Sequence, residues 1–328
     1  MKSLINSTVI VLLLMIPFIY SCSDGSNEDQ MEEEMDDKEN PIKQGNLSIK
    51  ITDAPIDDTH VSGAFMTFTG VRVGEETIML ENKVTLDVMA LQNGNAFQLL
   101  NDSIEIGTYT SLELIVDENT DVEGNQPGCY VLDNNQVKHP LETQASGSFM
   151  LSLESLNNEV EENASSEWVV DIDLRKAIRY QEGNNEDDQY TFTADVQSSL
   201  RVVDNNHFKI EGKIQDILGV SGDEAIVYVY KKGSFNVQEE TTLSSNTDVQ
   251  FKNAVTSSKV KSDGSFEIHY LDDDEYEIQI ISYDKMSDGT IEAKGMLQVN
   301  PIGDIDLLGI QLTNDLELNL TTVAVVPF

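Results

Sequence analysis

Apolar and polar residues alternate over many short stretches of the chain after residue 45. Leu47, Ile49 and Ile51 alternate with polar neighbours. The same period of two recurs in the stretches 64–73, 112–116, 149–153, 168–174 and 192–196. Side chains of a strand point alternately to opposite faces, so this pattern predicts half-buried strands. Long helical periodicity is missing, and only Thr85–Leu91 and Leu174–Ile178 could form a short helix or turn.

A second series of strands follows the polar break at Asp204-Asn205-Asn206. Its alternating stretches are 208–214, 226–230, 266–270, 276–280 and 316–320. Short strands separated by Gly, Asn and Asp clusters are typical of β-sandwiches. The predicted fold class is therefore all-β, with two Ig-like or transthyretin-like sandwich domains at residues 45–204 and 208–328.

The only long apolar run lies near the N-terminus. Val9 to Ile16 is unbroken, and Pro17 follows it. A membrane-spanning helix needs about 20 apolar residues, so this shorter run predicts a signal peptide at residues 1–21. The Ser21-Cys22 junction resembles the lipobox of bacterial lipoproteins. That resemblance implies a diacylglyceryl group on Cys22, and Ser23 after it favours the outer membrane. An ordinary secretory signal with an incidental cysteine is the alternative.

Charge limits the classes of partner. The chain carries 20 Lys and Arg against 59 Asp and Glu, for a formal charge of −39. Such a polyanion repels phosphate backbones and anionic lipids, which excludes nucleic acid as a partner and leaves the lipid as the only membrane contact. Residues 22–44 form an acidic segment that predicts a disordered tether. This tether is a solvated spacer or a surface-export signal, and the two are compatible.

Two resemblances accompany these patterns. The opening Gly45 to Pro55, the Gly107-x-Tyr109 pair, Ser146-Gly147 and Asp171-Ile172-Asp173 resemble a bacterial lipoprotein family with a domain of unknown function 4382, over residues 45 to 203. The proline expected just before Ser146 is not in the same place. That family carries no established activity to transfer.

The region from Phe208 to about Tyr283 is similar to carboxypeptidase regulatory-like, transthyretin-like domains. The resemblance lies in Ile210-x-Gly212-x-Ile214, in residues 225–230 and in Asp263-Gly264-Ser265-Phe266. Asp274-Glu275-Tyr276 departs from the Gly-x-Tyr that such domains commonly have. The resemblance implies a carbohydrate-binding-like fold that serves as a structural or binding module of a surface protein.

Few residues are candidates for chemistry. The four histidines lack metal-ligand spacing, and Cys129 precedes a strand as a small buried hydrophobe. The loop from Asp117 to Gly124 places oxygen ligands at alternate positions, which predicts a calcium site formed by Asp117, Asn119, Asp121 and Glu123. The EF-hand spacing is broken, so an ordinary acidic turn is the alternative.

Asp171 and Asp173 lie on one face of a predicted strand, so their side chains should be about 6–7 Å apart. Glycosidase carboxylates lie about 5–9.5 Å apart, so the spacing allows catalysis. The alternation instead favours a solvated outer face opposite Trp168, Val170 and Ile172.

The preferred function is non-catalytic: a lipid-anchored, surface-exposed binding, adhesion or scaffold protein whose partner is an extracellular protein or a glycan. The alternatives are an extracellular hydrolase that uses paired carboxylates, and a purely structural spacer. A binding module predicts a groove or an exposed aromatic patch. A hydrolase predicts a cleft with a carboxylate buried beside a second acid, and a spacer predicts neither.

Overall fold

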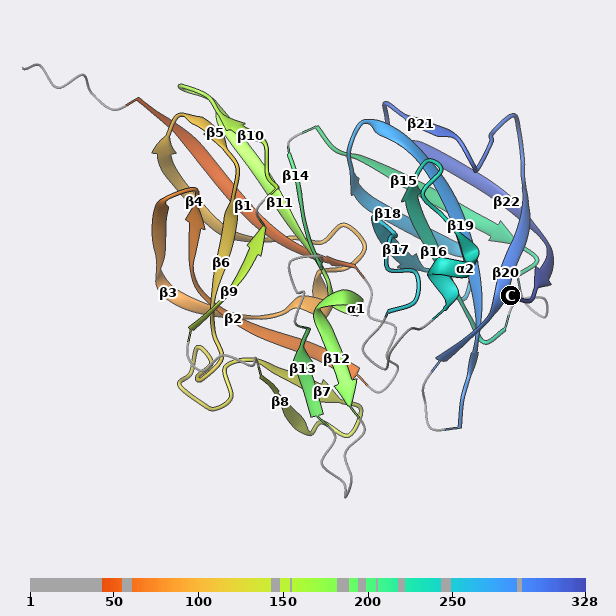
Figure 1. Cartoon of the computed structure of the whole chain (residues 1–328), viewed down its shortest axis with the longest axis horizontal. Coiled ribbons are helices and arrows are strands. Elements are labelled where there is room, and N and C mark those ends of the chain that lie inside the picture. The colour runs from red at the N-terminus through yellow and green to blue at the C-terminus, as the bar shows by residue number, and fades with distance from the viewer. Residues whose placement is uncertain are drawn as a thin grey trace, which may run out of the picture. The chain divides into compact units, whose positions relative to one another are not determined.

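A computed structural model describes residues 43–328 except 55–60, 143–147, 154, 182–188, 194–198, 205, 218–221, 243–248 and 288–290. Residues Ile42–Phe328 form one compact unit. Its elements are almost all strands, which confirms the all-β prediction (Figure 1). The signal peptide, Cys22 and nearly all of the tether lie outside the described residues.

Two main sheets and a short ribbon make up the part before residue 204. One sheet has the order β14-β11-β1-β4, and the other has the order β12-β13-β8-β7-β2-β6-β9 with β3 paired to β2. The first contains β14 (Leu200–Val203), β11 (Ser165–Asp173), β1 (Gln44–Ala54) and β4 (Phe97–Glu105). The second contains β12 (Ile178–Gln181), β13 (Gln189–Phe192), β8 (Lys138–Glu142), β7 (Tyr130–Asp133), β2 (Val61–Val73), β6 (Leu112–Asp117), β9 (Ser148–Leu153) and β3 (Glu76–Asp87). The ribbon pairs β5 (Gly107–Tyr109) with β10 (Asn158–Val160).

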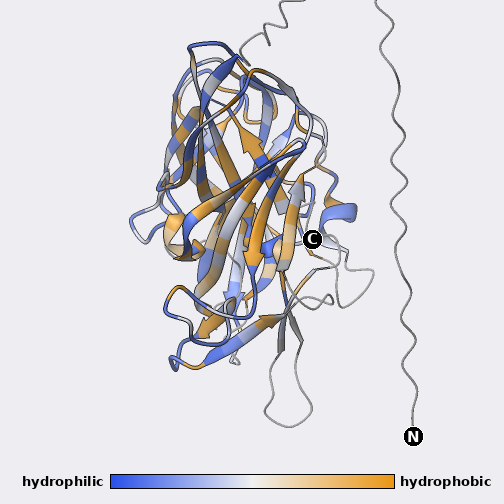
Figure 2. Ribbon diagram, turned by 90° about the vertical axis from the view of Figure 1, so that its left-hand side faces the viewer, coloured by the Kyte–Doolittle hydropathy of each residue, from blue (hydrophilic) through white to orange (hydrophobic). Residues whose placement is uncertain are grey.

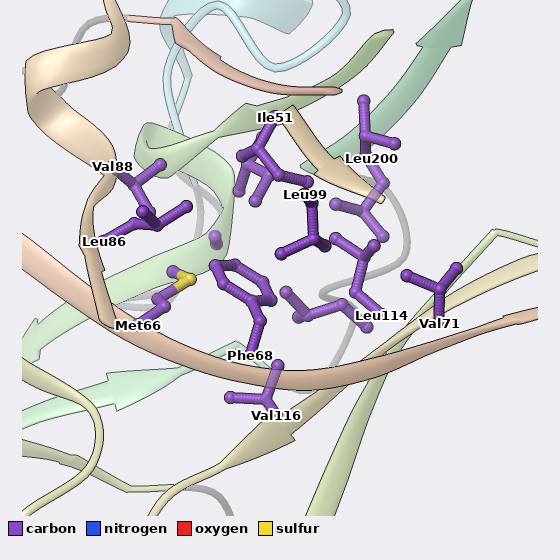
Figure 3. Packing of buried hydrophobic residues seen from close by; sticks show 14 of the residues in the cluster. Ile51, Met66, Phe68, Val71, Leu86, Val88, Leu99, Leu114, Val116 and Leu200 are labelled. Atoms are coloured by element: carbon purple, nitrogen blue, oxygen red, sulfur yellow. The ribbon is translucent and has the colours of Figure 1, made fainter. Parts of the chain in front are cut away.

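The inner faces of the two main sheets share one hydrophobic core. Hydrophobic and hydrophilic residues alternate along many strands, as the sequence pattern predicts (Figure 2). Phe68 of β2 is fully buried and packs with residues of the facing sheet, among them Leu99 and Leu200 (Figure 3). Burying such side chains contributes about 1.5–3 kcal/mol each. We call this part of the molecule the first sandwich.

A single sheet forms the part after residue 208. Its order is β17-β16-β19-β20-β22-β15-β18, with β21 paired to β19. Strands β17 and β18 at its two edges come into contact, so the sheet folds over on itself. We call this part the second sandwich. Its strands are β17 (Thr256–Lys259), β16 (Glu224–Lys231), β19 (Asp274–Lys285), β20 (Ile291–Pro301), β22 (Leu316–Val326), β15 (Phe208–Gln215), β18 (Ser265–Leu271) and β21 (Ile310–Leu312).

Within the described chain, no sheet mixes strands from before residue 204 with strands from after residue 208. The domain boundary itself stays a prediction, because residues 42–328 form one unit. Gly212 explains part of the second sequence motif: a Cβ on it would lie 2.1 Å from the ring of Phe266, its partner in the β15–β18 ladder. Only glycine leaves room for that ring.

The few helical segments are short. Val88–Leu91 forms the 3-10 helix η1, Leu174–Ala177 forms α1 and Val237–Thr241 forms α2. Two of these fall in the stretches that the sequence marked as a short helix or turn. Asp173 caps α1, because its side chain accepts a hydrogen bond from the backbone N–H of Arg175. In the part of the chain that the structure describes, no helix is both long and apolar enough to cross a membrane.

Candidate functional site

A groove with room for a small molecule lies at one end of the first sandwich. It has a volume of about 360 Å³ and is formed by β10, the loop after it, the start of β11 and the segment after β14. Figure 1 shows β5 and β10 side by side there. Its polar walls carry Asn157, Asn158, Glu159, Glu161, Asp204 and Asn206. Small-molecule sites commonly span about 300–1,000 Å³, so this groove has room for a ligand.

Backbone pairing and one aromatic contact hold the groove in shape. β10 pairs with β5 from Asn158 to Val160, and the Ser166 hydroxyl donates to the carbonyl of Glu159 at 3.2 Å. Trp168 lines the groove but is only 1% exposed, and the ring of Tyr109 meets its indole edge-on at 6.1 Å. The indole is therefore part of the floor rather than an open stacking surface.

Gly45, the first residue of the Gly45–Pro55 motif, packs against the loop that forms one wall of the groove. A Cβ on Gly45 would lie 2.4 Å from the carbonyl oxygen of Glu161, so a larger residue would push the groove loop outward. Asn46 fixes the same loop through its backbone N–H, which donates to the carbonyl of Ala164 at 3.1 Å. The motif at the start of β1 therefore positions a wall of the groove that lies more than a hundred residues away in sequence.

The chemistry of the groove is polar and acidic. Glu159, Glu161 and Asp204 contribute carboxylates, Ser165 and Ser166 contribute hydroxyls, and no Lys, Arg or His is among the described lining residues. The side-chain nitrogen of Asn158 is buried, with no hydrogen-bond partner among the described atoms. Buried polar atoms nearly always have a partner, so this N–H group is an unsatisfied donor beside the groove.

The carboxylates of the predicted calcium loop already have hydrogen-bond partners within the protein. One carboxylate oxygen of Asp117 accepts the backbone N–H of Asn119 at 2.9 Å, and the other accepts Lys83 Nζ at 3.0 Å. Burial raises the pKa of Asp117, but the hydrogen bonds and charge of Lys83 and the backbone bonds outweigh it and lower the pKa below its usual value.

The carboxylate of Asp121 also accepts hydrogen bonds from the protein. Its Oδ1 accepts the backbone N–H groups of Glu123 at 3.0 Å and Asn125 at 2.8 Å. Within the described residues, no group of three or more His, Cys, Asp or Glu side chains is placed to hold a metal ion. Calcium binding at Asp117, Asn119, Asp121 and Glu123 therefore stays a prediction, and the geometry favours an acidic turn.

Asp171 and Asp173 do not lie on a solvated face. They do lie opposite Trp168 and Ile172 in β11, but they are only 5% exposed, so the solvated interpretation is wrong. The second sandwich covers this face: Tyr270 and Phe251 accept hydrogen bonds through their carbonyls from Arg201 and Arg175.

Basic side chains pair with both acids. Arg201 lies opposite Asp171 in the β11–β14 ladder, and its Nη2 is 2.6 Å from Asp171 Oδ2. Arg175 Nη2 lies 2.8 Å and Lys176 Nζ 3.3 Å from Asp173 Oδ2. Burial raises the pKa of Asp173, but the two cations outweigh it and hold that pKa below its usual value. The ion pairs therefore lie within the first sandwich, and their cations reach the second sandwich through hydrogen bonds to the carbonyls of Phe251, Ala254 and Tyr270.

Cys129 has the predicted role of a small buried hydrophobe. It is fully buried immediately before β7, and burial raises the pKa of its thiol to about 12. The groove residues were not predicted from the sequence: Asp204-Asn205-Asn206 indicated only a domain break. The signal that could have found them is the Asn, Ser and Glu cluster from Asn157 to Ser166, which joins two strands without apolar alternation.

Known structures align with the chain only loosely. The Bacillus anthracis TIE protein is 9% identical with a TM-score of 0.19, and the alignment covers 85% of this chain and 34% of that one. BcpA, the major pilin subunit of Bacillus cereus, is 10% identical with a TM-score of 0.20, over 85% of this chain and 70% of that one. GBS52, the minor pilin of Streptococcus agalactiae, is 11% identical with a TM-score of 0.19, over 86% and 97%. Alignments at these scores carry no argument about function.

Sequence comparison is more informative for the first sandwich. No curated protein matches the chain. The carboxypeptidase regulatory-like resemblance of the second sandwich stays a prediction. Residues 44–194, however, match the model of the family described as Domain of unknown function (DUF4382), which confirms the resemblance to that domain for this part of the chain, while the lipoprotein assignment stays a prediction.

Proposed function

We propose that this protein is a non-catalytic, lipid-anchored surface protein whose first sandwich binds a neutral, hydroxyl-rich ligand such as a short glycan. The observation that carries this proposal is the 360 Å³ groove and the unpartnered side-chain N–H of Asn158 in it. Sugar hydroxyls both donate and accept hydrogen bonds. Carboxylates, amides and serine hydroxyls in one groove match both roles.

Charge supports a neutral ligand over an anionic one. Three carboxylates line the groove on a chain with a formal charge of −39. An anionic glycan or a phosphate would meet repulsion both at the groove and at long range. The buried indole of Trp168 leaves hydrogen bonds, rather than ring stacking, as the main contacts.

A hydrolase is less well supported. A hydrolase requires a cleft in which a carboxylate is buried beside a second acid. Asp53 and Asp171 are two buried acids that line the same cavity, so the paired acids are present. That cavity has a volume of only about 20 Å³, which holds a single water-sized particle and no substrate. A pure spacer leaves the groove without a role.

The binding experiment is a screen of neutral glycans against residues 43–328, followed by titration of the best one. Asn158→Asp replaces the free N–H donor with an acceptor and should weaken binding about tenfold or more, since a lost hydrogen bond to a buried polar group costs about 1–3 kcal/mol. Asn314→Asp adds the same charge on an exposed residue of the second sandwich and should leave affinity unchanged. Equal affinities for both variants would reject the groove as the site.

The anchor has a separate test. Cys22→Ala removes the residue that would carry the lipid. The variant should lose incorporation of labelled fatty acid and leave the membrane fraction. Unchanged fractionation together with unchanged labelling would contradict the lipoprotein assignment and leave the groove proposal untouched.

A further inference from the structure

A small polar cavity lies between the two sandwiches. Its volume is about 20 Å³. Thr52, Asp53 and Asp171 line it from the ends of β1 and β11, and Ser257, His269 and Tyr270 line it from β17 and β18. The hydroxyl of Tyr270 donates to the carbonyl of Gly94 at 2.8 Å, which fastens the two walls together.

Three oxygen atoms of this lining are left without partners. Asp53 Oδ1, Asp171 Oδ1 and Ser257 Oγ are buried, and none has a hydrogen bond to any described atom. Their residues are 7%, 5% and 5% exposed. Because buried polar atoms are almost always satisfied, three unsatisfied oxygens around one cavity indicate an occupant. The volume is enough for one water-sized particle.

The charges around the cavity favour a cation. Arg201 neutralises Asp171 through its other oxygen, at 2.6 Å. The Asp53 carboxylate accepts hydrogen bonds from neutral groups, the side chain of Gln92 at 3.2 Å and the backbone N–H of Leu174. The negative charges of Asp171 and Asp173 act on Asp53 as well.

The remaining charged groups nearby are engaged elsewhere. Arg175 and Lys176 are held by Asp173, and Glu267 of the cavity wall is paired with Lys261 at 2.8 Å and with His269 at 3.3 Å. Asp53 is thus a buried acid that lacks a basic partner within the described structure. A water molecule could satisfy the three oxygens but would supply no charge to balance it.

We propose that this cavity binds one hard cation of about the size of calcium or sodium, which joins the two sandwiches. Two carboxylate oxygens and one hydroxyl oxygen are the ligands that hard cations prefer. Calcium tolerates irregular geometry and mixed oxygen ligands, whereas magnesium demands near-octahedral coordination and gives up water reluctantly. The site is separate from the loop around Asp121 and from the groove around Asn158.

The first experiment is thermal unfolding of the full chain after treatment with a chelator. Calcium chloride, magnesium chloride and sodium chloride are compared at matched ionic strength. Calcium at 100 times its dissociation constant should raise the melting temperature by about 5 °C or more, and magnesium should raise it less. A shift in sodium chloride alone would identify sodium as the ion. Equal shifts in all three salts would indicate charge screening and overturn the proposal.

Variants locate the ion. Asp53→Asn keeps the shape of the side chain and should abolish the calcium shift. Asp121→Asn should leave it intact, and the reverse result would assign the ion to the acidic loop instead. Ser257→Ala keeps both carboxylates and should weaken calcium binding about tenfold, which gives a second readout should Asp53→Asn fold poorly.

Terbium luminescence provides an independent measurement. Terbium binds calcium's oxygen ligands and emits when a nearby aromatic ring is excited, and Tyr270 lines the cavity. Emission that calcium displaces, and that Asp53→Asn removes, is the expected result. No emission, with a higher melting temperature for Asp53→Asn in every salt, would show that Asp53 simply carries a proton and would overturn the proposal.

Discussion

Arg175→Met should destabilise the protein because it removes the most buried charge between the sandwiches. The Arg175 side chain is fully buried, pairs with Asp173 at 2.8 Å and lies over the ring of Tyr228 at 5.0 Å. Its Nη1 donates at 3.5 Å to the carbonyl of Phe251 in the second sandwich. Methionine fills much of the same volume but leaves the carboxylate without its main partner.

The magnitude follows from what remains. Removing one partner of a buried ion pair costs about 3–5 kcal/mol. Lys176 Nζ still lies 3.3 Å from Asp173, so the lower end, about 3 kcal/mol, is expected. That corresponds to a fall of about 6–10 °C in melting temperature. Urea unfolding can be followed through the fluorescence of Trp168, the single tryptophan, which lies on the same strand as Asp173.

A matched control and a double variant make this prediction refutable. Lys50→Met breaks a partly exposed pair with Glu167, at 2.7 Å, and should cost no more than about 1 kcal/mol. Arg175→Met combined with Asp173→Asn should recover part of the lost stability, because the buried carboxylate that arginine no longer neutralises is then absent as well. If Arg175→Met costs no more than the control, or if the double variant is simply additive, the ion pair between Arg175 and Asp173 does not stabilise the protein.

Three further predictions concern single residues. Cys129 should resist thiol reagents at pH 8 in the folded full chain carrying Cys22→Ala and should react only after unfolding, because it is buried and its pKa is about 12; rapid labelling of the folded protein would contradict this. Gly212→Ala should lower the free energy of unfolding in urea by about 1–3 kcal/mol, because its Cβ would overlap the Phe266 ring. Gly309→Ala is the control: its Cβ would lie 3.4 Å from Lys232 Nζ, so the variant should cost under about 0.5 kcal/mol. Burial raises the pKa of Asp53, so in the presence of a chelator its contribution to stability is complete at low pH and is lost as the pH rises through the raised value. Asp53→Asn should flatten that loss in urea unfolding across pH, and an unchanged pH profile would refute it.

About half of the described strands were predicted from the sequence, because burial on one face imposes a period of two. β3 was harder to predict: much of it is exposed or half-buried, so its sequence carries little alternation. The end of β1 shows the opposite problem. Thr52 and Asp53 look like solvent-facing residues in the sequence, yet both are buried.

The sites could not be predicted for a related reason. The face that bears Asp171 and Asp173 is covered by residues near 250 and 270. The local sequence around a strand does not indicate burial by residues from a distant part of the chain. The groove is likewise assembled from residues between Asn157 and Trp168 together with Asp204 and Asn206. The period of two in the sequence predicts which face of a strand is apolar. It does not predict whether the polar face is covered by another sandwich.

Both sandwiches are completed by strands that are distant in the chain. β1 pairs in parallel with β11, so that Asn46 meets Ser165, and β15 pairs in parallel with β22, so that Ile210 meets Leu316. Contacts between such distant residues require long loops to close before any pairing energy is gained, which slows folding. During synthesis, β1 has no parallel partner until residue 165 is available, and β15 has none until residue 316 is available. Each sandwich therefore depends on its last-made strands, and neither can complete its parallel pairing before those strands have been synthesised.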